Sequence, residues 1–169
     1  MELQFTIRPA AVRDAQDINE IRRMPGVMEH ILGVPSEPLS GTEAFLENLG
    51  PNSHQMVAVT EAEGKEKVIG VASLDVGSRP RTRHRGTIGI MVHKKYHGMG
   101  VGTALMETLL DIADNWLMLV RVDLGVFTEN TRAIAFYERL GFTAEGVCRK
   151  AAIRDGEYAD ELIMVRFRE

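Results

Sequence analysis

The sequence predicts an α/β protein built on a mixed, mostly antiparallel sheet with a parallel βαβ unit at its centre. Apolar runs typical of strands alternate with stretches of helical periodicity, in the order β-α-α-β-β-β-α-β-α-β-β. A strand, a helix and another strand follow one another over residues 85–127, so these two strands should be parallel neighbours. Turn sequences at 61–67 and 155–156 join other strand pairs, which should therefore be antiparallel.

The N-terminal elements are a strand and a helix. Alternation of apolar and polar residues over 3–7 predicts a strand that Pro9 ends. Apolar residues at helical spacing over 12–21 predict a helix. The segment 25–38 contains three prolines and two glycines and predicts a loop.

A second helix and a hairpin should follow this loop. Ser40 and Glu43 form a capping-box pattern, which predicts that a short helix begins there. Apolar runs over 55–60 and 68–76 predict two strands, and the charged segment around Gly64 should form the turn between them.

The central βαβ unit begins with a strand over 85–92. Gly89 lies inside this strand, and a glycine in that position often marks a bulge or a close approach of another backbone. A helix over 101–119 and a strand over 121–127 should follow. The helix presents one apolar stripe, formed by Val101, Leu105, Leu109, Ile112, Trp116 and Leu119.

The C-terminal part should form one helix and a hairpin. The helix should begin at Asn130 or Thr131 and end at Gly141, which suits the residue just after a helix. Strands over 143–153 and 157–167 should be joined by a tight turn at Asp155-Gly156.

Length and composition favour one domain over residues 1–169, with 44% hydrophobic and 26% charged residues. Cys148 is the only cysteine, so the chain can form no internal disulfide and a reducing compartment suits it. The N-terminus lacks the pattern of a secretory signal, and no apolar run reaches the roughly 20 residues of a membrane span. We therefore expect a cytoplasmic protein without membrane attachment.

The segment between the central strand and helix carries the strongest functional pattern. His97-Gly98-Met99-Gly100-Val101-Gly102 follows the strand that ends at Val92 and leads into the helix. Glycines allow the backbone to approach a ligand closely, and the first N–H groups of a helix attract negative charge. Residues 97–103 are therefore predicted to bind a phosphate-bearing ligand.

The charge around this segment supports an anionic ligand. The formal net charge of the chain is −4, yet no acidic residue occurs between Asp75 and Glu107. A local basic window in an acidic protein favours a small polyanionic ligand over nucleic acid. The window holds Arg79, Arg81, Arg83, His84, Arg85, His93, Lys94, Lys95 and His97.

Two common glycine-rich phosphate sites fit poorly. A dinucleotide-binding turn places its glycines directly after the strand, whereas four residues follow Val92 here before the motif, and Thr103 replaces the third glycine. The ribose-binding candidate Asp123 lies inside a strand rather than at its end. A P-loop needs Gly-Lys-Ser/Thr, and that triplet is absent.

Two linked motifs resemble the Gcn5-related N-acetyltransferase (GNAT) superfamily. The spacing from Val92 to Gly100 and Gly102 resembles its pyrophosphate motif Gln/Arg-x-x-Gly-x-Gly/Ala, with His97 in the first position. The block 130–142 is similar to Asn-x-x-Ala-x-x-x-Tyr-x-x-x-Gly-Phe. The resemblance extends over essentially the whole chain. It implies a GNAT-like mixed sheet and acetyl transfer from acetyl-CoA to an amine, without a metal.

The resemblance also implies roles for individual residues. Tyr137 is the expected general acid, and a backbone N–H of Val92 or Met91 should bind the acetyl oxygen. His97 could make pyrophosphate binding sensitive to pH. The residues expected to bind the cofactor are Met91, Val92, His97, Gly98, Met99, Gly100, Val101, Gly102, Thr103, Asn130 and Tyr137.

The acceptor is less well defined than the donor. Segments 79–84, 114–117 and 154–160 resemble a bacterial subgroup that acetylates the α-amino group of free amino acids. A protein N-terminus, a polyamine or an amine toxin remain alternative acceptors, and a non-catalytic acyl-CoA-binding module is the alternative from another class. A homodimer remains open, and no nucleic-acid partner is expected.

The sequence also leaves the general base open. His84, Asp75 and Glu29 are the candidates, each of which could act through a water molecule. Arg81 and Arg83 could bind the carboxylate of an amino acid or the phosphates of the cofactor.

Overall fold

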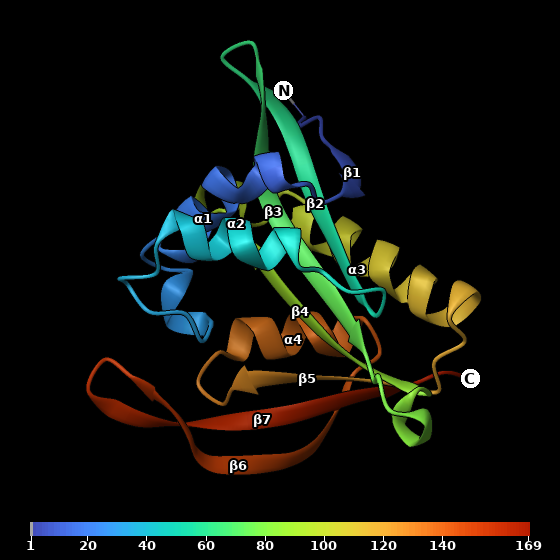
Figure 1. Ribbon diagram of the computed structural model, residues 1–169. Coiled ribbons are helices and arrows are strands. Elements are labelled where there is room, and N and C mark those ends of the chain that lie inside the picture. The colour runs from blue at the N-terminus through green and yellow to red at the C-terminus, as the bar shows by residue number, and fades with distance from the viewer. Residues whose placement is uncertain (1) are drawn as a thin grey trace.

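The computed structural model describes residues 2–169, which form one seven-stranded sheet in the order β1-β2-β3-β4-β5-β7-β6 (Figure 1). β4 and β5 are parallel, and every other pair of neighbours is antiparallel. The predicted fold class and element order are confirmed. The strands are β1 (Thr6–Pro9), β2 (Ser53–Ala62), β3 (Lys65–Val76), β4 (Arg85–Val92), β5 (Arg121–Phe127), β6 (Thr143–Arg154) and β7 (Glu157–Phe167).

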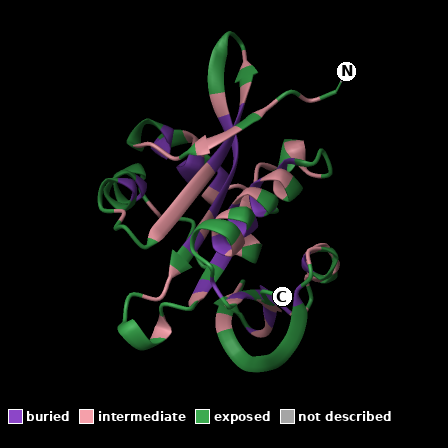
Figure 2. Cartoon of the chain, turned by 90° about the vertical axis from the view of Figure 1, so that its right-hand side faces the viewer, coloured by how far each residue is buried: buried purple, intermediate pink, exposed green. Residues whose placement is uncertain are grey.

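Helices cover both faces of the sheet. The helices α1 and α2 lie on one face of the strands β2–β4, while α3 lies on the other face and α4 lies on that same side against β5 and β7 (Figures 1 and 2). The helices are α1 (Ala15–Arg22), α2 (Leu39–Glu47), α3 (Val101–Asp111) and α4 (Thr131–Arg139), with 3-10 turns at Val12–Asp14, Met28–His30, Pro80–Thr82 and Lys94–Tyr96.

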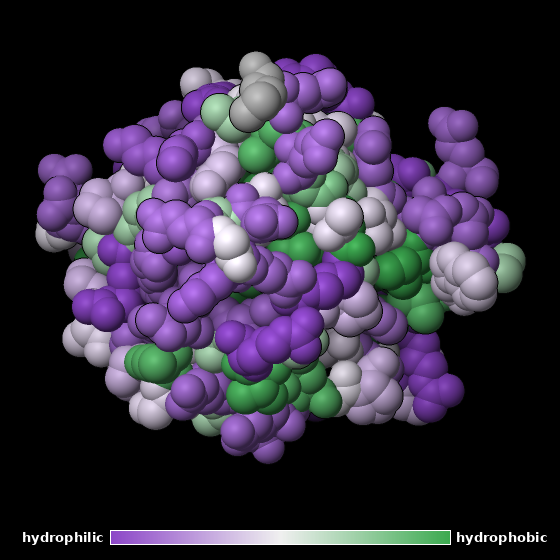
Figure 3. All heavy atoms as spheres, turned by 90° about the horizontal axis from the view of Figure 1, so that it is seen from above, coloured by the Kyte–Doolittle hydropathy of each residue, from purple (hydrophilic) through white to green (hydrophobic). Residues whose placement is uncertain are grey.

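The core follows this layering. Buried residues concentrate where α3 packs on the central strands, and the tip of the β2–β3 hairpin is exposed (Figure 2). From above, the surface is mainly hydrophilic, with hydrophobic side chains in small separate areas (Figure 3). The apolar periodicity of the strands and helices is therefore used mainly for packing.

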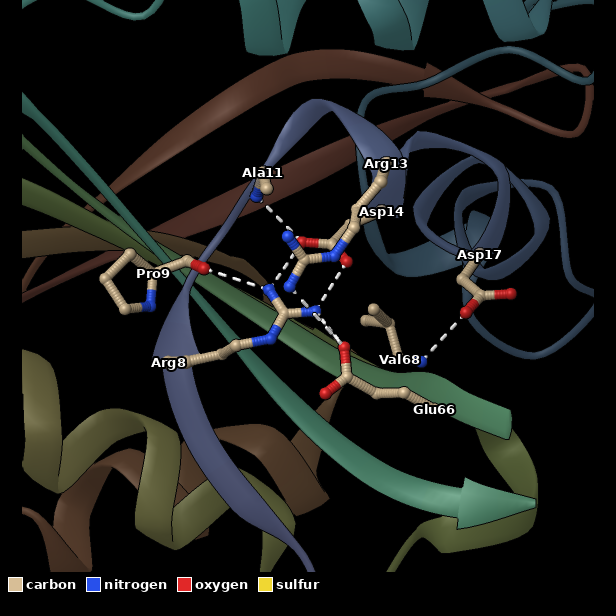
Figure 4. Close-up of polar contacts among 8 residues, drawn as sticks. All are labelled: Arg8, Pro9, Ala11, Arg13, Asp14, Asp17, Glu66 and Val68. Atoms are coloured by element: carbon tan, nitrogen blue, oxygen red, sulfur yellow. Dashed lines mark hydrogen bonds and ion pairs between the residues drawn. The ribbon is translucent and has the colours of Figure 1, made fainter. Parts of the chain in front are cut away.

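A polar network fastens the N-terminal edge of the sheet (Figure 4). The Arg8 guanidinium donates to both carboxylate oxygens of Asp14, at 2.7 and 2.8 Å, and to Glu66 at 2.5 Å. The N–H of Ala11 also donates to Asp14, at 2.7 Å. Burial alone would raise the pKa of Asp14, but the bonds from Arg8 and Ala11 outweigh it, and the pKa lies below its usual value.

The predicted boundaries need two corrections near the N-terminus. The first strand begins at Thr6, after the predicted Leu3 and Phe5, and it ends at Pro9 as predicted; proline is tolerated there because β1 is an edge strand. The second helix begins at Leu39 with Pro38 as its N-cap, so Ser40 lies inside the helix and the predicted capping box does not form. Proline is well placed at a helix start because it has no N–H that needs a partner.

Two predictions about the central unit are also wrong. β3 and β4 pair in continuous register past Gly89, so no bulge forms there; register shifts occur instead between β2 and β3, at Ala58–Val59, and at two places between β6 and β7. Beyond Asp111 the α3 helix widens into a π-helical segment, Ile112–Trp116. The wider turn breaks the 3.6-residue period, which leaves Trp116 78% exposed although the stripe pattern placed it in the core.

The C-terminal elements agree closely with the prediction. Asn130 caps α4, and Gly141 adopts a φ of 91° just after it. Asp155 and Gly156 both have positive φ, as a tight hairpin turn requires. No helix among residues 2–169 is long and apolar enough to span a membrane.

Candidate active site

The parallel strands β4 and β5 separate after three paired residues. Pairing runs from Arg85↔Arg121 to Thr87↔Asp123 and then ends, and the strands diverge beyond it (Figure 1). A cavity of about 500 Å³ opens beside the diverging strands and includes the loop before α3 and one face of α4. Its lining includes Ile90, Met91, Val92, His97, Gly98, Gly100, Gly102, Thr103, Gly125, Val126, Asn130 and Tyr137.

The glycine-rich loop forms the start of α3 as the sequence predicted. Gly98 and Gly100 have φ of 74° and 83°, a conformation that favours glycine, and Gly100 is the N-cap of the helix. The first N–H groups of α3 have no partner within the helix, so they can receive an anion. The side chains of Met99 and Val101 do not line the cavity, because Met99 is exposed and Val101 is buried in the core.

The end of β4 leaves backbone groups without a strand partner. The His93 N–H donates to the Ile69 carbonyl of β3 at 2.9 Å. Hydrogen-bonded and non-bonded pairs alternate along an antiparallel ladder, so Met91 directs its N–H towards β3 and Val92 directs its N–H away from it. Since β5 has diverged at this point, Val92 is the better placed of the two predicted donors.

His97 connects the glycine-rich loop to the same strand end. Its Nε2 lies 2.7 Å from the Val92 carbonyl oxygen, and because a carbonyl only accepts, Nε2 carries the hydrogen. Only Nδ1 remains for a ligand, and a neutral imidazole would accept rather than donate there. A contact between His97 and pyrophosphate therefore requires the charged ring and remains a prediction.

Tyr137 lies deep in the cavity. Its side chain is 9% exposed and packs against Phe136 and Phe142, with ring centroids 5.4 and 6.0 Å apart. Burial raises the pKa of Tyr137 to about 12. Its hydroxyl therefore keeps its proton at neutral pH. Asn130, the other expected residue on this helix, uses its side-chain oxygen to accept the Ala133 N–H at 3.2 Å.

The comparisons with known proteins agree with this geometry. Residues 21–142 match the model of the acetyltransferase (GNAT) family. The chain belongs to the GNAT family. It is an N-acetyltransferase of the kind that uses acetyl-CoA. It is 36% identical to the L-amino acid N-acetyltransferase AaaT of Escherichia coli K12, over 96% of this chain and 98% of that protein.

Solved structures show the same fold. A GNAT acetyltransferase from Streptococcus pneumoniae superposes with a TM-score of 0.79 and is 25% identical, over 98% of this chain and all of that one. The spermidine N-acetyltransferase of Vibrio cholerae, solved with CoA and spermine, gives a TM-score of 0.84 at 23% identity, over 98% of this chain and 96% of that one.

Two arginines outside the predicted site residues also line the cavity of about 500 Å³, called the donor cavity below because it includes the glycine-rich loop predicted to bind the cofactor. Arg132 and Arg139 are seven residues apart on α4, with Phe136 between them on the same helix face. A guanidinium nitrogen of Arg132 lies 3.9 Å from the position of a Cβ at Gly98. Both guanidinium groups could pair with phosphates. Their helical spacing within the block 130–142 is the sequence signal that could have indicated that they share a face.

The basic window of the sequence does not form one site in the enzyme. The residues of 79–85 lie at the start of β4, whereas Lys94, Lys95 and His97 follow its end. The seven residue steps from Arg85 to Val92 correspond to about 23 Å along a strand. Arg81, Arg83 and His84 are therefore remote from the glycine-rich loop, and the predicted single basic zone is wrong.

None of the three candidate bases lines the cavity of about 500 Å³. In the β3–β4 ladder Asp75 lies opposite Thr87, the last residue of β4 that pairs with β5. Its carboxylate accepts the Ser53 hydroxyl at 2.6 Å. The carboxylate of Glu29 accepts hydrogen bonds from its own N–H and from that of Gly26, which lower its pKa. A lower pKa makes Glu29 a weaker base.

A second cavity of about 310 Å³ lies on the α1/α2 side of the sheet and shares Ile31, Ile90 and Met91 with the first. The Arg22 guanidinium lies in its wall and donates to Glu37 at 3.1 and 3.3 Å. The shared residues place this cavity directly beside the donor cavity. Its other lining residues include Ile18, Thr42, Phe45, Leu46, Gln55, Ser73, Asp75 and Gly89.

Proposed function

We propose that this GNAT enzyme transfers the acetyl group of acetyl-CoA to the α-amino group of a free L-amino acid. The observation that carries the proposal is the similarity to the L-amino acid N-acetyltransferase AaaT, which extends over nearly the whole of both chains. Similarity of this extent includes the part of the chain that would bind the acceptor as well as the cofactor motifs. The choice of acceptor depends on that part of the chain.

The donor cavity supports acyl transfer with two groups of this chain. The Val92 N–H binds the acetyl oxygen and stabilises the negative charge that develops on it. The neutral amine attacks the acetyl carbon, so a C–N bond forms and the C–S bond breaks. Tyr137 donates its proton to the leaving thiolate, the attacking nitrogen loses one proton to solvent, and Tyr137 regains a proton from solvent.

The second cavity supports an amino-acid acceptor. A guanidinium is the preferred partner of a carboxylate, and Arg22 presents one in the wall of that cavity. Its partner Glu37 is only half-buried, so the ion pair can open to water and admit a carboxylate. Phe45, Leu46 and Ile18 provide apolar surface for an amino-acid side chain.

A polyamine is the second candidate acceptor. The chain is 24% identical to the spermidine N(1)-acetyltransferase of E. coli K12. Glu37 and Asp75, which line the second cavity, could bind positively charged amines. Arg22 opposes this candidate because it places a cation in the same wall.

A thiol-release assay decides between these functions. The purified chain is incubated with acetyl-CoA and with L-leucine, L-phenylalanine, L-lysine, L-glutamate, spermidine or a peptide with a free N-terminus, and free CoA is measured. We expect acceptor-dependent release with one or more amino acids and none with spermidine. Turnover of spermidine alone would favour the polyamine enzyme. Tight acetyl-CoA binding without turnover of any amine would identify a binding module.

A further inference from the structure

One carboxylate beside the opening between β4 and β5 has no partner. Glu161 of β7 is half-buried, and its carboxylate makes no hydrogen bond or ion pair within residues 2–169. The carboxylate of Asp123, on the neighbouring strand β5, is engaged: it accepts hydrogen bonds from Arg85, Arg121 and Thr87. A half-buried carboxylate without a cation favours the approach of a positively charged group.

The carboxylate of Glu161 lies over Gly125 of β5. A Cβ atom at Gly125 would lie 2.5 Å from the Glu161 Cδ and 2.6 and 2.7 Å from its carboxylate oxygens. The carboxylate therefore occupies the space that a side chain at position 125 would fill. Gly125 itself lines the donor cavity, so Glu161 lies beside that cavity.

This position lies on the face of the sheet that the second cavity covers. The last pair of β4 and β5 is Thr87↔Asp123, so Gly89 and Gly125 each lie two residues beyond it, where the strands diverge. Side chains two residues apart in a strand share one face, so both glycines belong to the face that carries Thr87 and Asp123. Gly89 lines the second cavity and Gly125 lines the first. Glu161 thus lies at the face from which an acceptor would approach the opening.

We propose that Glu161 is the residue that binds the acceptor's ammonium group before transfer. This inference rests on the proposed function, because it assigns the acceptor's amino group to this carboxylate. Its negative charge holds the amino group on the α1/α2 side of the opening, beside Gly125. It does not contact the glycine-rich loop that would hold the cofactor, so its effect should be confined to the acceptor.

The test is steady-state kinetics of Glu161→Gln with an amino acid that the wild-type chain acetylates. The substitution keeps the shape of the side chain and removes its charge. We expect the KM for the amino acid to rise about tenfold or more, because a charge-assisted contact is lost. We expect kcat to change less than about twofold and the Kd for acetyl-CoA to stay the same. Glu157→Gln, an exposed change on the same strand, serves as the matched control and should match wild type.

A second variant tests the geometry. Gly125→Ala places a methyl group where the Glu161 carboxylate lies and should raise the KM in the same direction. In the Glu161→Gln background the added methyl should have a smaller effect, because the two changes act on one contact. Fully additive effects on KM would contradict the shared contact.

The outcomes separate the two proposals. Wild-type turnover of an amino acid with an unchanged KM in Glu161→Gln would overturn the role of Glu161 and leave the proposed function intact. If the wild-type chain acetylates no amine, the proposed function fails. Calorimetric titration of L-leucine and spermidine into the CoA-bound protein then decides: binding weakened by Glu161→Gln supports the role, and equal or absent binding overturns it.

Discussion

The two ends of β4 differ in how they meet β5. At the closed end, Asp123 of β5 accepts hydrogen bonds from Arg85 at 2.7 Å and Thr87 at 3.1 Å of β4. At the open end, the strands have separated and the backbone of Val92 faces a cavity. The strand β4 is thus bound to β5 at its start, whereas at its end the edge that faces β5 has no strand partner.

This difference shows how a sheet can present backbone groups to a ligand. A strand whose N–H groups are all paired offers none for catalysis, and a strand that is not anchored would not hold them in place. The side-chain bonds of Asp123 fasten the strands at the point where the ladder ends. We infer that they fix the angle of the opening and the position of the Val92 N–H.

The largest expected effect lies at the open end, where Tyr137→Phe removes the proposed acid and keeps the ring. We expect kcat to fall on the order of tenfold to several hundredfold, with little change in the Kd for acetyl-CoA. Stopped assays of CoA release and a separate binding titration measure the two quantities. Tyr158→Phe, at an exposed tyrosine of β7, is the control, and an unchanged kcat in Tyr137→Phe would remove the residue from the mechanism.

At the closed end, Asp123→Ala should reduce the free energy of unfolding by about 2 kcal/mol, because Arg85 and Arg121 lose a buried shared partner. The opening should also lose its fixed angle, so the Kd for acetyl-CoA should rise as well. Denaturant titration and a binding titration on the same protein measure both effects.

Glu145→Ala is the matched control for this variant. Glu145 also pairs with Arg121, at 2.5 Å, but it is exposed and accepts no hydrogen bond from β4 among the described residues. Its loss should leave the free energy of unfolding nearly unchanged, because an exposed ion pair contributes little. If Asp123→Ala weakens stability but leaves acetyl-CoA binding as in wild type, the closed end does not set the geometry of the open end.

The sequence predicted the elements well because their signals are local. The bounds of β4 and β7 agree with the predicted strands, since apolar patterning and turn residues define them within a few positions. The helix that follows the glycine-rich loop was predicted too long. Trp116 continues the apolar period, but the π-helical segment that shifts the phase has no simple sequence signal.

The site was predictable only where its residues belong to one continuous motif. The loop 97–103 and the helix that carries Tyr137 are such motifs, and both line the cavity. The prediction that the basic window forms one site was wrong because a strand of eight residues separates its two ends. The contact of Glu161 with Gly125 depends on the register between β5 and β7, which residues far apart in the sequence establish together.

The third and smallest effect tests whether a buried ion pair far from the opening matters to catalysis. Asp14, like Asp123, is a buried aspartate bound by arginine, but it lies at the β1 edge of the sheet (Figure 4). Asp14→Asn should lower the free energy of unfolding at pH 7 by about 1–2 kcal/mol and leave kcat and KM unchanged. Asp155→Asn, in an exposed turn that asparagine tolerates, is the matched control.

The pH dependence of this effect distinguishes a charge contribution from a loss of packing. The folded-state pKa of Asp14 lies below that of the unfolded chain, which is about 3.9, because bonds from Arg8 and Ala11 outweigh the effect of burial. The unfolded state therefore binds the proton more readily, and the stabilisation by Asp14 is complete above the unfolded pKa. It should decline as the pH falls from about 4 through the folded pKa. A difference in unfolding free energy between wild type and Asp14→Asn that stays constant down to pH 2.5 would show that the side chain contributes by shape and not by charge.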